Sequence, residues 1–290
     1  SYPPVLNLLE NLLSNHRNVV LIAGNTDSIP SRILDHDGIF VKDIPLNDSS
    51  DLIGRVKRRL CIGRMYKDAL DSFYSDDDVV WTTTDSTVRA LSTALDGKKH
   101  VLQLMELEDS FPLFSGARFL KFDLPSYARK AWKVVVPEQN RAYIQQVMWN
   151  LPQVPKVLPN KPYSLDPGYA DDQISFLLDR LRQEDRKIVM YLGVMSVDRN
   201  LGPFAEAVEM MGEDFVLYVL GKVPEGQQEV FDAFLSAHQQ VVYLGFFNPP
   251  SHLHFLQYAY IGLLPYISNY KSKVISPLNV LYCAPNKIYE

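Results

Sequence analysis

The sequence has few cysteines, no long apolar run and no excess of positive charge. Its two cysteines, Cys61 and Cys283, lie in different halves of the 290-residue chain. They form no disulfide framework and lack metal-ligand spacing, which favours a reducing cytoplasm. No apolar run approaches the ~20 residues of a membrane-spanning helix. The net charge of −5 disfavours broad attraction to nucleic acid phosphates. We therefore expect a cytoplasmic protein that does not bind nucleic acid.

Several common catalytic motifs are also missing. The chain contains no Gly-x-Gly-x-x-Gly, no Walker loop, no Gly-x-Ser-x-Gly and no His-Glu-x-x-His. These absences count against dehydrogenases, NTPases, serine hydrolases and metalloproteases. The composition, with 47% hydrophobic and 22% charged residues, is that of a protein with buried cores. The length fits two domains of roughly 150 residues each.

Apolar strands alternate with amphipathic helices along both halves of the chain. Short apolar runs typical of buried parallel strands occur at 19–23, 38–41, 79–82, 101–105, 133–136, 188–192, 215–220, 241–244 and 261–264. Helical patterns separate them, which predicts parallel sheets covered on both faces. Four prolines interrupt the alternation, at Pro152, Pro155, Pro159 and Pro162. We expect α/β domains at 1–150 and 164–290, joined by a stiff linker at 151–163.

Both ends of the sequence have the pattern of a truncated chain. It opens directly on a helical pattern, although an alternating domain normally begins with a strand. It stops at Glu290, barely one turn after Pro285, a residue suited to the start of a helix. We expect the second domain to be incomplete.

Glycines and cations follow the strands of the second half. Three strands run into Gly193, Gly221 and Gly245, and Arg199 and Lys222 follow the first two. Ligands bind beyond the carboxyl ends of parallel strands, glycine allows close approach, and cations suit a diphosphate. Asn286 and Lys287 follow Pro285 at a predicted helix start, which would favour an anion. Each feature alone is more typical of an ordinary turn or a solvated loop, and only their convergence on one edge indicates a site.

In order and spacing, these segments resemble the donor-site blocks of retaining GT-B glycosyltransferases, the group 1 or family 4-like enzymes. The segments are Tyr191-Leu192-Gly193 with Asp198-Arg199, Leu220-Gly221-Lys222, Leu244-Gly245-Phe246, and Ala284 to Glu290. Val135 to Glu138 with Arg141, and Leu158 to Pro162, resemble the family's approach to its interdomain linker. The resemblance implies two Rossmann-like domains with parallel sheets facing across a cleft that holds a nucleotide-sugar.

The resemblance also implies roles for single residues. Gly193 would lie by the donor phosphates, and Arg199 and Lys222 would stabilise the leaving diphosphate. Gly221, Asn286 and Lys287 are further candidates for donor binding. The backbone of Leu244, Gly245 and Phe246 would receive the base, and Glu290 would bind the ribose hydroxyls. The first glutamate of the family's Glu-x7-Glu motif is replaced here by Tyr282. No metal and no cofactor are implied.

The first half offers one carboxylate as a substitute for a histidine that many relatives carry at the cleft end of a strand. The corresponding strand runs into Glu106-Leu107-Glu108-Asp109, with His100 at its opposite end. Glu106 is the candidate to orient or deprotonate the acceptor hydroxyl. It could equally cap the next segment.

Three further signals have simpler interpretations. Asp76-Asp77-Asp78 matches a metal-binding Asp-x-Asp pattern but precedes a strand, so we expect a solvated acidic turn. His252 and His254 lack carboxylate or cysteine partners in sequence, so we expect a surface role for both. The basic amphipathic helix from Asp51 to Tyr74 could make weak peripheral contact with the inner face of a membrane, or simply be solvated.

The resemblance therefore implies a glycosyltransferase that moves a sugar from a nucleotide-diphosphate donor to a saccharide or lipid-linked acceptor hydroxyl, with retention and without a metal. We expect it to act in the synthesis of cell-surface polysaccharide or glycolipid. Two alternatives stay open. One is a nucleotide-sugar 2-epimerase of the same architecture, and the other is a non-catalytic nucleotide-sugar-binding protein.

Overall fold

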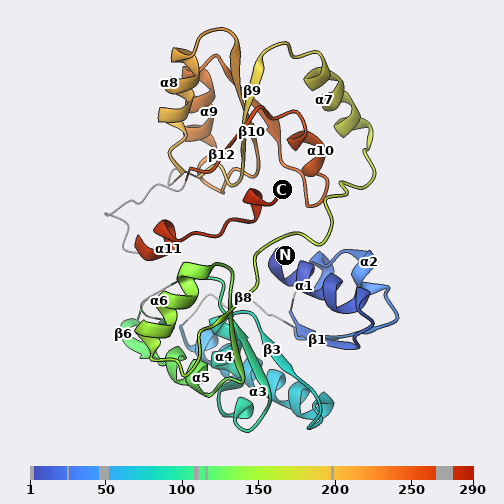
Figure 1. The fold of residues 1–290 in the computed structure, drawn as a ribbon, viewed down its shortest axis with the longest axis vertical. Helices are drawn as coiled ribbons and strands as arrows, with labels where there is room; N and C mark the ends of the chain where they lie inside the picture. The colour runs from blue at the N-terminus through green and yellow to red at the C-terminus, as the bar shows by residue number, and fades with distance from the viewer. Residues whose placement is uncertain are drawn as a thin grey trace. The chain divides into compact units, whose positions relative to one another are not determined.

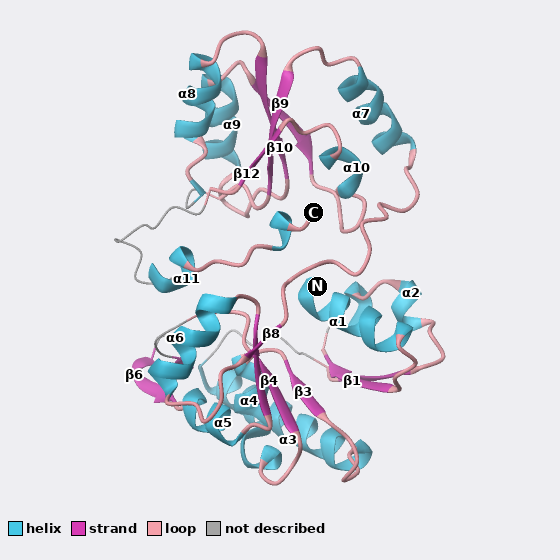
Figure 2. Ribbon diagram, viewed as in Figure 1, coloured by secondary structure: helices cyan, strands magenta, loops and turns pink. Residues whose placement is uncertain are grey.

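The computed structural model describes residues 3–24, 26–45, 52–107, 111–114, 117–196, 199–265 and 277–290, without the side chains of 52–60, 111–121 and 277. The chain forms two compact units (Figure 1). The first comprises Ser1–Tyr163 and Val274–Asn286, and the second Ser164–Lys273 and Lys287–Glu290. Each unit combines helices with parallel strands (Figure 2), which confirms the predicted α/β class.

The second unit is built on a four-stranded parallel sheet in the order β11-β10-β9-β12. Its strands are β9 (Lys187–Leu192), β10 (Phe215–Leu220), β11 (Val241–Gly245) and β12 (Ile261–Leu263). Its helices are α7 (Asp172–Arg182), α8 (Gly202–Met210), α9 (Gln228–Ala237) and α10 (Leu253–Leu256). Figure 2 shows α8 and α9 on one side of the sheet and α7 and α10 on the other.

Both faces of this sheet are buried, and β9 shows how the sequence achieves it. Ile188 and Met190 belong to a core with α7 and with Phe255 of α10. Val189 and Tyr191 point to the opposite core, which includes residues of α8 and α9. Because successive strand residues face opposite sides, a strand buried on both sides must be a continuous apolar run. This accounts for the success of the strand predictions in this half.

The first unit contains a four-stranded parallel sheet in the order β3-β4-β7-β8 and a separate parallel pair, β1-β2. The strands are β1 (Val19–Ala23), β2 (Ile39–Asp43), β3 (Val80–Thr82), β4 (His100–Gln103), β7 (Lys133–Val136) and β8 (Lys156–Val157). The helices are α1 (Pro3–Ser14), α2 (Ser31–Leu34), α3 (Leu52–Phe73), α4 (Asp85–Leu91), α5 (Leu124–Lys130) and α6 (Gln139–Trp149). Each sheet has its own core: α4 to α6 contribute to the larger one, and α1 and α2 to the smaller.

Two elements of this unit differ from the expectation. An antiparallel hairpin, β5 (Phe111–Phe114) with β6 (Ala117–Phe122), interrupts the alternation. The proline-rich stretch 151–163 is not only a linker, because β8 within it pairs with β7, and the Leu158 amide donates to the Val136 carbonyl at 2.8 Å. Lys156, Val157 and Leu158 lie between prolines and keep the N–H groups that pairing needs.

The last part of the chain also departs from the expected division, which assigned all of 164–290 to the second domain. The described residues 277–286, with the short helix α11 (Pro277–Leu281), belong to the first unit. Hydrogen bonds hold them there: the Arg141 guanidinium donates to the Tyr282 carbonyl, and the Asn160 amide donates to the Ala284 carbonyl at 2.9 Å. Long-range bonds of this kind leave no periodic signal in a sequence.

Candidate functional site

The carboxyl ends of β9 and β10 approach each other so closely that the connection after β10 requires glycine. The Gly193 amide donates to the Leu220 carbonyl at 2.9 Å. Gly221 has a positive φ of 150°, and a Cβ at this position would lie 1.7 Å from the Gly193 carbonyl oxygen. Any side chain at 221 would therefore displace the backbone that follows β9. The two predicted glycines together shape this edge of the sheet.

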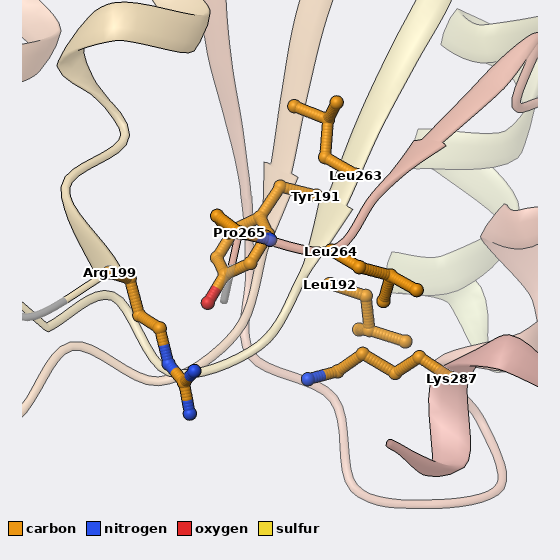
Figure 3. A pocket seen from close by; sticks show the side chains of 7 residues that line it. All are labelled: Tyr191, Leu192, Arg199, Leu263, Leu264, Pro265 and Lys287. Atoms are coloured by element: carbon orange, nitrogen blue, oxygen red, sulfur yellow. The ribbon is translucent and has the colours of Figure 1, made fainter. Parts of the chain in front are cut away.

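Two cations meet beside this edge in a small pocket of the second unit (Figure 3). Arg199 follows β9, and Lys287 comes from the 3₁₀ turn Asn286–Ile288 near the end of the chain. The pocket is lined by Tyr191, Leu192, Arg199, Leu263, Leu264, Pro265 and Lys287. In Figure 3 the charged ends of Arg199 and Lys287 point toward the same space beyond the strand ends.

Gly193 also sets the position of Lys287. A Cβ on Gly193 would lie 2.9 Å from the Lys287 Nζ and 2.6 Å from the Tyr191 hydroxyl. That hydroxyl donates to the Val194 carbonyl at 2.9 Å and so fixes the loop after β9. The ammonium group of Lys287 can therefore lie close to the backbone of residue 193 because that residue has no side chain.

The electrostatics of Lys287 favour an anion at this place. Burial lowers the pKa of Lys287, the positive charge of Arg199 lowers it further, and Glu290 acts in the opposite direction. A partly buried ammonium beside a guanidinium is a costly arrangement, and the charge of Glu290 opposes that cost. A bound diphosphate would offset both the desolvation and the repulsion.

Glu290, predicted to bind ribose, contacts a histidine in the same unit. Its Oε2 lies 3.3 Å from the Nε2 of His252, and the two side chains are 11% and 9% exposed. His254 is also buried, so the predicted surface role of both histidines is wrong. The error arose because the carboxylate partner lies 38 positions away along the chain.

The other described residues that we predicted to bind the donor do not line this pocket. Lys222 is exposed and does not line the pocket, although its carbonyl accepts from the Met195 amide at 2.9 Å. Leu244 has its side chain in the core, and Phe246 is exposed just beyond β11. Gly245 accepts from the Gly221 amide at 2.9 Å. Asn286 begins a turn of three residues, too short for the dipole of the helix we expected there. Asp198 lies outside the described residues.

Glu106 lies in the first unit just beyond the carboxyl end of β4, and its side chain is exposed. Its carboxylate accepts a short hydrogen bond from the Asn279 amide, so it caps no neighbouring segment through this contact. His100, at the other end of β4, bonds Thr82 Oγ1 at 2.8 Å. Burial lowers the pKa of His100 to about 4, which keeps the ring neutral. Glu108 and Asp109 lie outside the described residues.

Comparison with known proteins gives the fold. No protein-family model matches the chain, and no curated protein matches it. Among solved structures, Anabaena Alr3699/HepE in complex with UDP and glucose superimposes with a TM-score of 0.63 at 12% identity, over 90% of this chain and 70% of that one. The chain has a GT-B fold.

Two further structures show how broad the GT-B fold is. A glycosyltransferase from Rickettsia africae matches with a TM-score of 0.59 at 12% identity, over 90% of this chain and 67% of that one. A putative UDP-N-acetylglucosamine 2-epimerase from Listeria monocytogenes matches with a TM-score of 0.56 at 14% identity, over 90% of this chain and 71% of that one. The fold alone therefore does not decide the activity, which must be argued from the site.

Neither a metal cluster nor a membrane span is found in the part of this GT-B chain that the structure describes. No three His, Cys, Asp or Glu side chains gather there. Asp78 accepts from the amide and the hydroxyl of Ser75 at 2.8 and 2.9 Å, as expected of an acidic turn. No described helix is long and apolar enough to cross a bilayer. Helix α3 forms where the basic helix was predicted, and its membrane contact stays a prediction.

Proposed function

We propose that the chain is a glycosyltransferase that moves a sugar from a nucleotide-diphosphate donor to an acceptor hydroxyl. The observation that carries the proposal is the meeting of Arg199 and Lys287 at the glycine-shaped edge of the second sheet. Two fixed cations beside close-lying backbone suit a diphosphate, the group that leaves in this reaction. The fold is consistent with this proposal, since HepE, whose structure was solved in complex with UDP and glucose, has a similar fold.

In the proposed reaction the bond between the anomeric carbon and the diphosphate oxygen breaks, and its electron pair stays with the diphosphate. Arg199 and Lys287 stabilise the charge that builds there, so that no divalent ion is required. The acceptor oxygen forms the new bond to the anomeric carbon with retention. Its proton passes to the carboxylate of Glu106. Glu290 holds the ribose hydroxyls, and the backbone at Leu244 to Phe246 receives the base.

The first test is a thermal-shift panel of UDP-, GDP-, ADP- and dTDP-sugars. A donor at 100 times its dissociation constant should stabilise the protein by about 2.7 kcal/mol. Transfer is then measured with the donor that binds, in the presence of EDTA, which should leave turnover unchanged. An epimer formed from donor alone would assign the chain to the epimerases. Binding without any turnover would make it a nucleotide-sugar-binding protein.

Variants test the phosphate site itself. Arg199→Ala and Lys287→Ala should each lower turnover by ~10²–10³-fold, by analogy with the removal of one oxyanion-hole donor. Lys222→Ala should have a smaller effect, because Lys222 is exposed and does not line the pocket. If Arg199→Ala and Lys287→Ala kept near-normal turnover, the diphosphate would have to bind elsewhere.

A further inference from the structure

The carboxylate of Glu106 is held by a side chain from the segment that returns to the first unit. Asn279 in α11 donates from its Nδ2 to Oε2 of Glu106. Its Oδ1 accepts from the Leu107 amide at 3.0 Å and from Nη2 of Arg141 at 2.8 Å. With two donors on the oxygen, the amide group has one orientation, in which its N–H points at the carboxylate.

The guanidinium of Arg141 holds Asn279 and the loop after β4 in place. Arg141 is only 4% exposed, and its Nη1 donates to the Met105 carbonyl at 2.8 Å. Its Nε donates to the Tyr282 carbonyl, so that one guanidinium ties the loop after β4 to the segment around α11. Arg141 lies in the first turn of α6, where Glu138 caps the helix and accepts from the Arg141 amide at 3.0 Å.

The chemistry of Asn279 differs from that of a simple anchor. The anchoring bonds from Leu107 and Arg141 to the side chain use only Oδ1, and Arg141 also donates to the backbone carbonyl of Asn279 at 3.3 Å. The bond to Glu106 uses the side-chain nitrogen. An asparagine carries no charge, so the bond orients the carboxylate without neutralising it as an arginine or lysine would. Glu106 remains exposed and can meet a substrate hydroxyl.

We propose that Asn279 is a positioning residue, which holds the Glu106 carboxylate in the orientation needed to accept a proton from the acceptor hydroxyl. This rests on the proposed function, in which Glu106 is the base. The competing explanation is that Asn279 only fastens α11 to the first unit.

Asn279→Asp separates the two explanations. The aspartate keeps an oxygen for Leu107 and Arg141, and so keeps the anchor. It replaces the donor to Glu106 by a second carboxylate oxygen, which repels it. Asn279→Leu removes all three side-chain bonds and keeps only the bond from Arg141 to the backbone carbonyl, so it serves as the comparison for a weakened anchor.

In activity, Asn279→Asp should lower kcat for transfer by ~10–100-fold, a part of what a general base contributes, with the donor KM unchanged. Glu106→Gln should lower it by ~10²-fold or more. Because Asn279 acts through Glu106, adding Asn279→Asp to Glu106→Gln should cause no further loss. Normal turnover of Asn279→Asp, or losses that multiply in the double variant, would leave only the anchoring role.

A second readout does not depend on the proposed function. In crystal structures of the wild type and Asn279→Asp, the Glu106 carboxylate should turn away from residue 279 in the variant while Arg141 and α11 keep their places. If Glu106 stays in place, the positioning role is wrong whatever the reaction is. If it turns away but no nucleotide-sugar is consumed by the wild type, the proposed function fails and the positioning stands.

Discussion

His252 and Glu290 form a buried pair in the second unit, with Nε2 and Oε2 3.3 Å apart. His252 stands directly before α10, and Glu290 follows Lys287 by less than one turn. The pair therefore fixes the short segment that carries both the pocket lysine and the predicted ribose ligand. To bond a carboxylate, the ring must carry a proton on Nε2.

The pair predicts different outcomes for two substitutions of His252. His252→Gln can place an N–H near the position of Nε2 and should keep most of the bond. His252→Leu removes the donor and leaves a largely buried carboxylate without it, which should cost about 1–3 kcal/mol. It should also weaken nucleotide binding, because Lys287 and Glu290 lose their support. Thermal unfolding and calorimetric titration of a nucleoside diphosphate check both effects; equal behaviour of the two variants would contradict this role.

The close approach of β9 and β10 predicts that Gly221 tolerates no side chain. Gly221→Ala would place a Cβ 1.7 Å from the Gly193 carbonyl oxygen, so the backbone must move. Gly212 is the matched control: it also has positive φ, +91°, but a Cβ there meets nothing within 4 Å. Gly212→Ala should cost only the strain of that backbone conformation, about 1–2 kcal/mol. Denaturant unfolding should show a clearly larger loss for Gly221→Ala, and similar losses would contradict the close approach.

The lowered pKa of Lys287 predicts a pH dependence of anion binding. The charged ammonium binds a diphosphate, so affinity should fall as pH rises through this pKa, which lies below the usual 10.5. The same shift costs the unliganded fold stability while the ammonium is charged. That cost is relieved as pH rises over this range, since the folded state gives up the proton before the unfolded state does. Lys287→Met should bind weakly and without this pH dependence. Titration of a nucleoside diphosphate across the alkaline range measures this pH dependence. If affinity changed with pH in the same way in the wild type and in Lys287→Met, Lys287 would be excluded from the site.

The strands and the glycines that follow them could be predicted from the sequence, because their causes are local. A strand such as β10 is apolar throughout since both of its faces are buried. Gly193 and Gly221 stand where such runs end. The predicted cleft between the two domains and the roles of the donor-side residues stay predictions.

The partners of the site residues could not be predicted in the same way. Glu106 meets Asn279 across 173 positions, and His252 meets Glu290 across 38. Neither contact leaves a period or motif in the sequence, because the fold alone brings these side chains together. The same holds for Lys287, which joins Arg199 in one pocket. Lys222, which we predicted to stabilise the diphosphate together with Arg199, does not line that pocket.

A last prediction concerns acid stability, at Glu184 beside the amino end of β9. Its carboxylate bonds Arg186 at 2.7 and 2.8 Å and accepts from the Tyr218 hydroxyl at 2.8 Å. Arg186 first, and Tyr218 after it, lower the pKa of Glu184 to about 2, although burial opposes them. The shift stabilises the fold fully above the ordinary pKa of 4.5. That contribution is lost as pH falls from there toward 2.

Tyr218→Phe keeps the ring in the core and removes the hydroxyl. It should therefore reduce the loss of unfolding free energy as pH falls from 4.5 toward 2. The contribution of the whole cluster should be about 2 kcal/mol, reduced from the full shift because the Arg186 side chain is 37% exposed. Tyr243→Phe is the control, since the hydroxyl of Tyr243 donates to the Gly221 carbonyl at 2.8 Å and no carboxylate takes part in that bond.

Urea unfolding at several pH values between 2 and 6 checks the prediction. The Tyr218 variant should lose less stability than the wild type on acidification, and the Tyr243 variant should lose as much. If the unfolding free energies of the wild type and Tyr218→Phe fell in parallel as pH was lowered, the Tyr218 hydroxyl would not stabilise the Glu184 carboxylate.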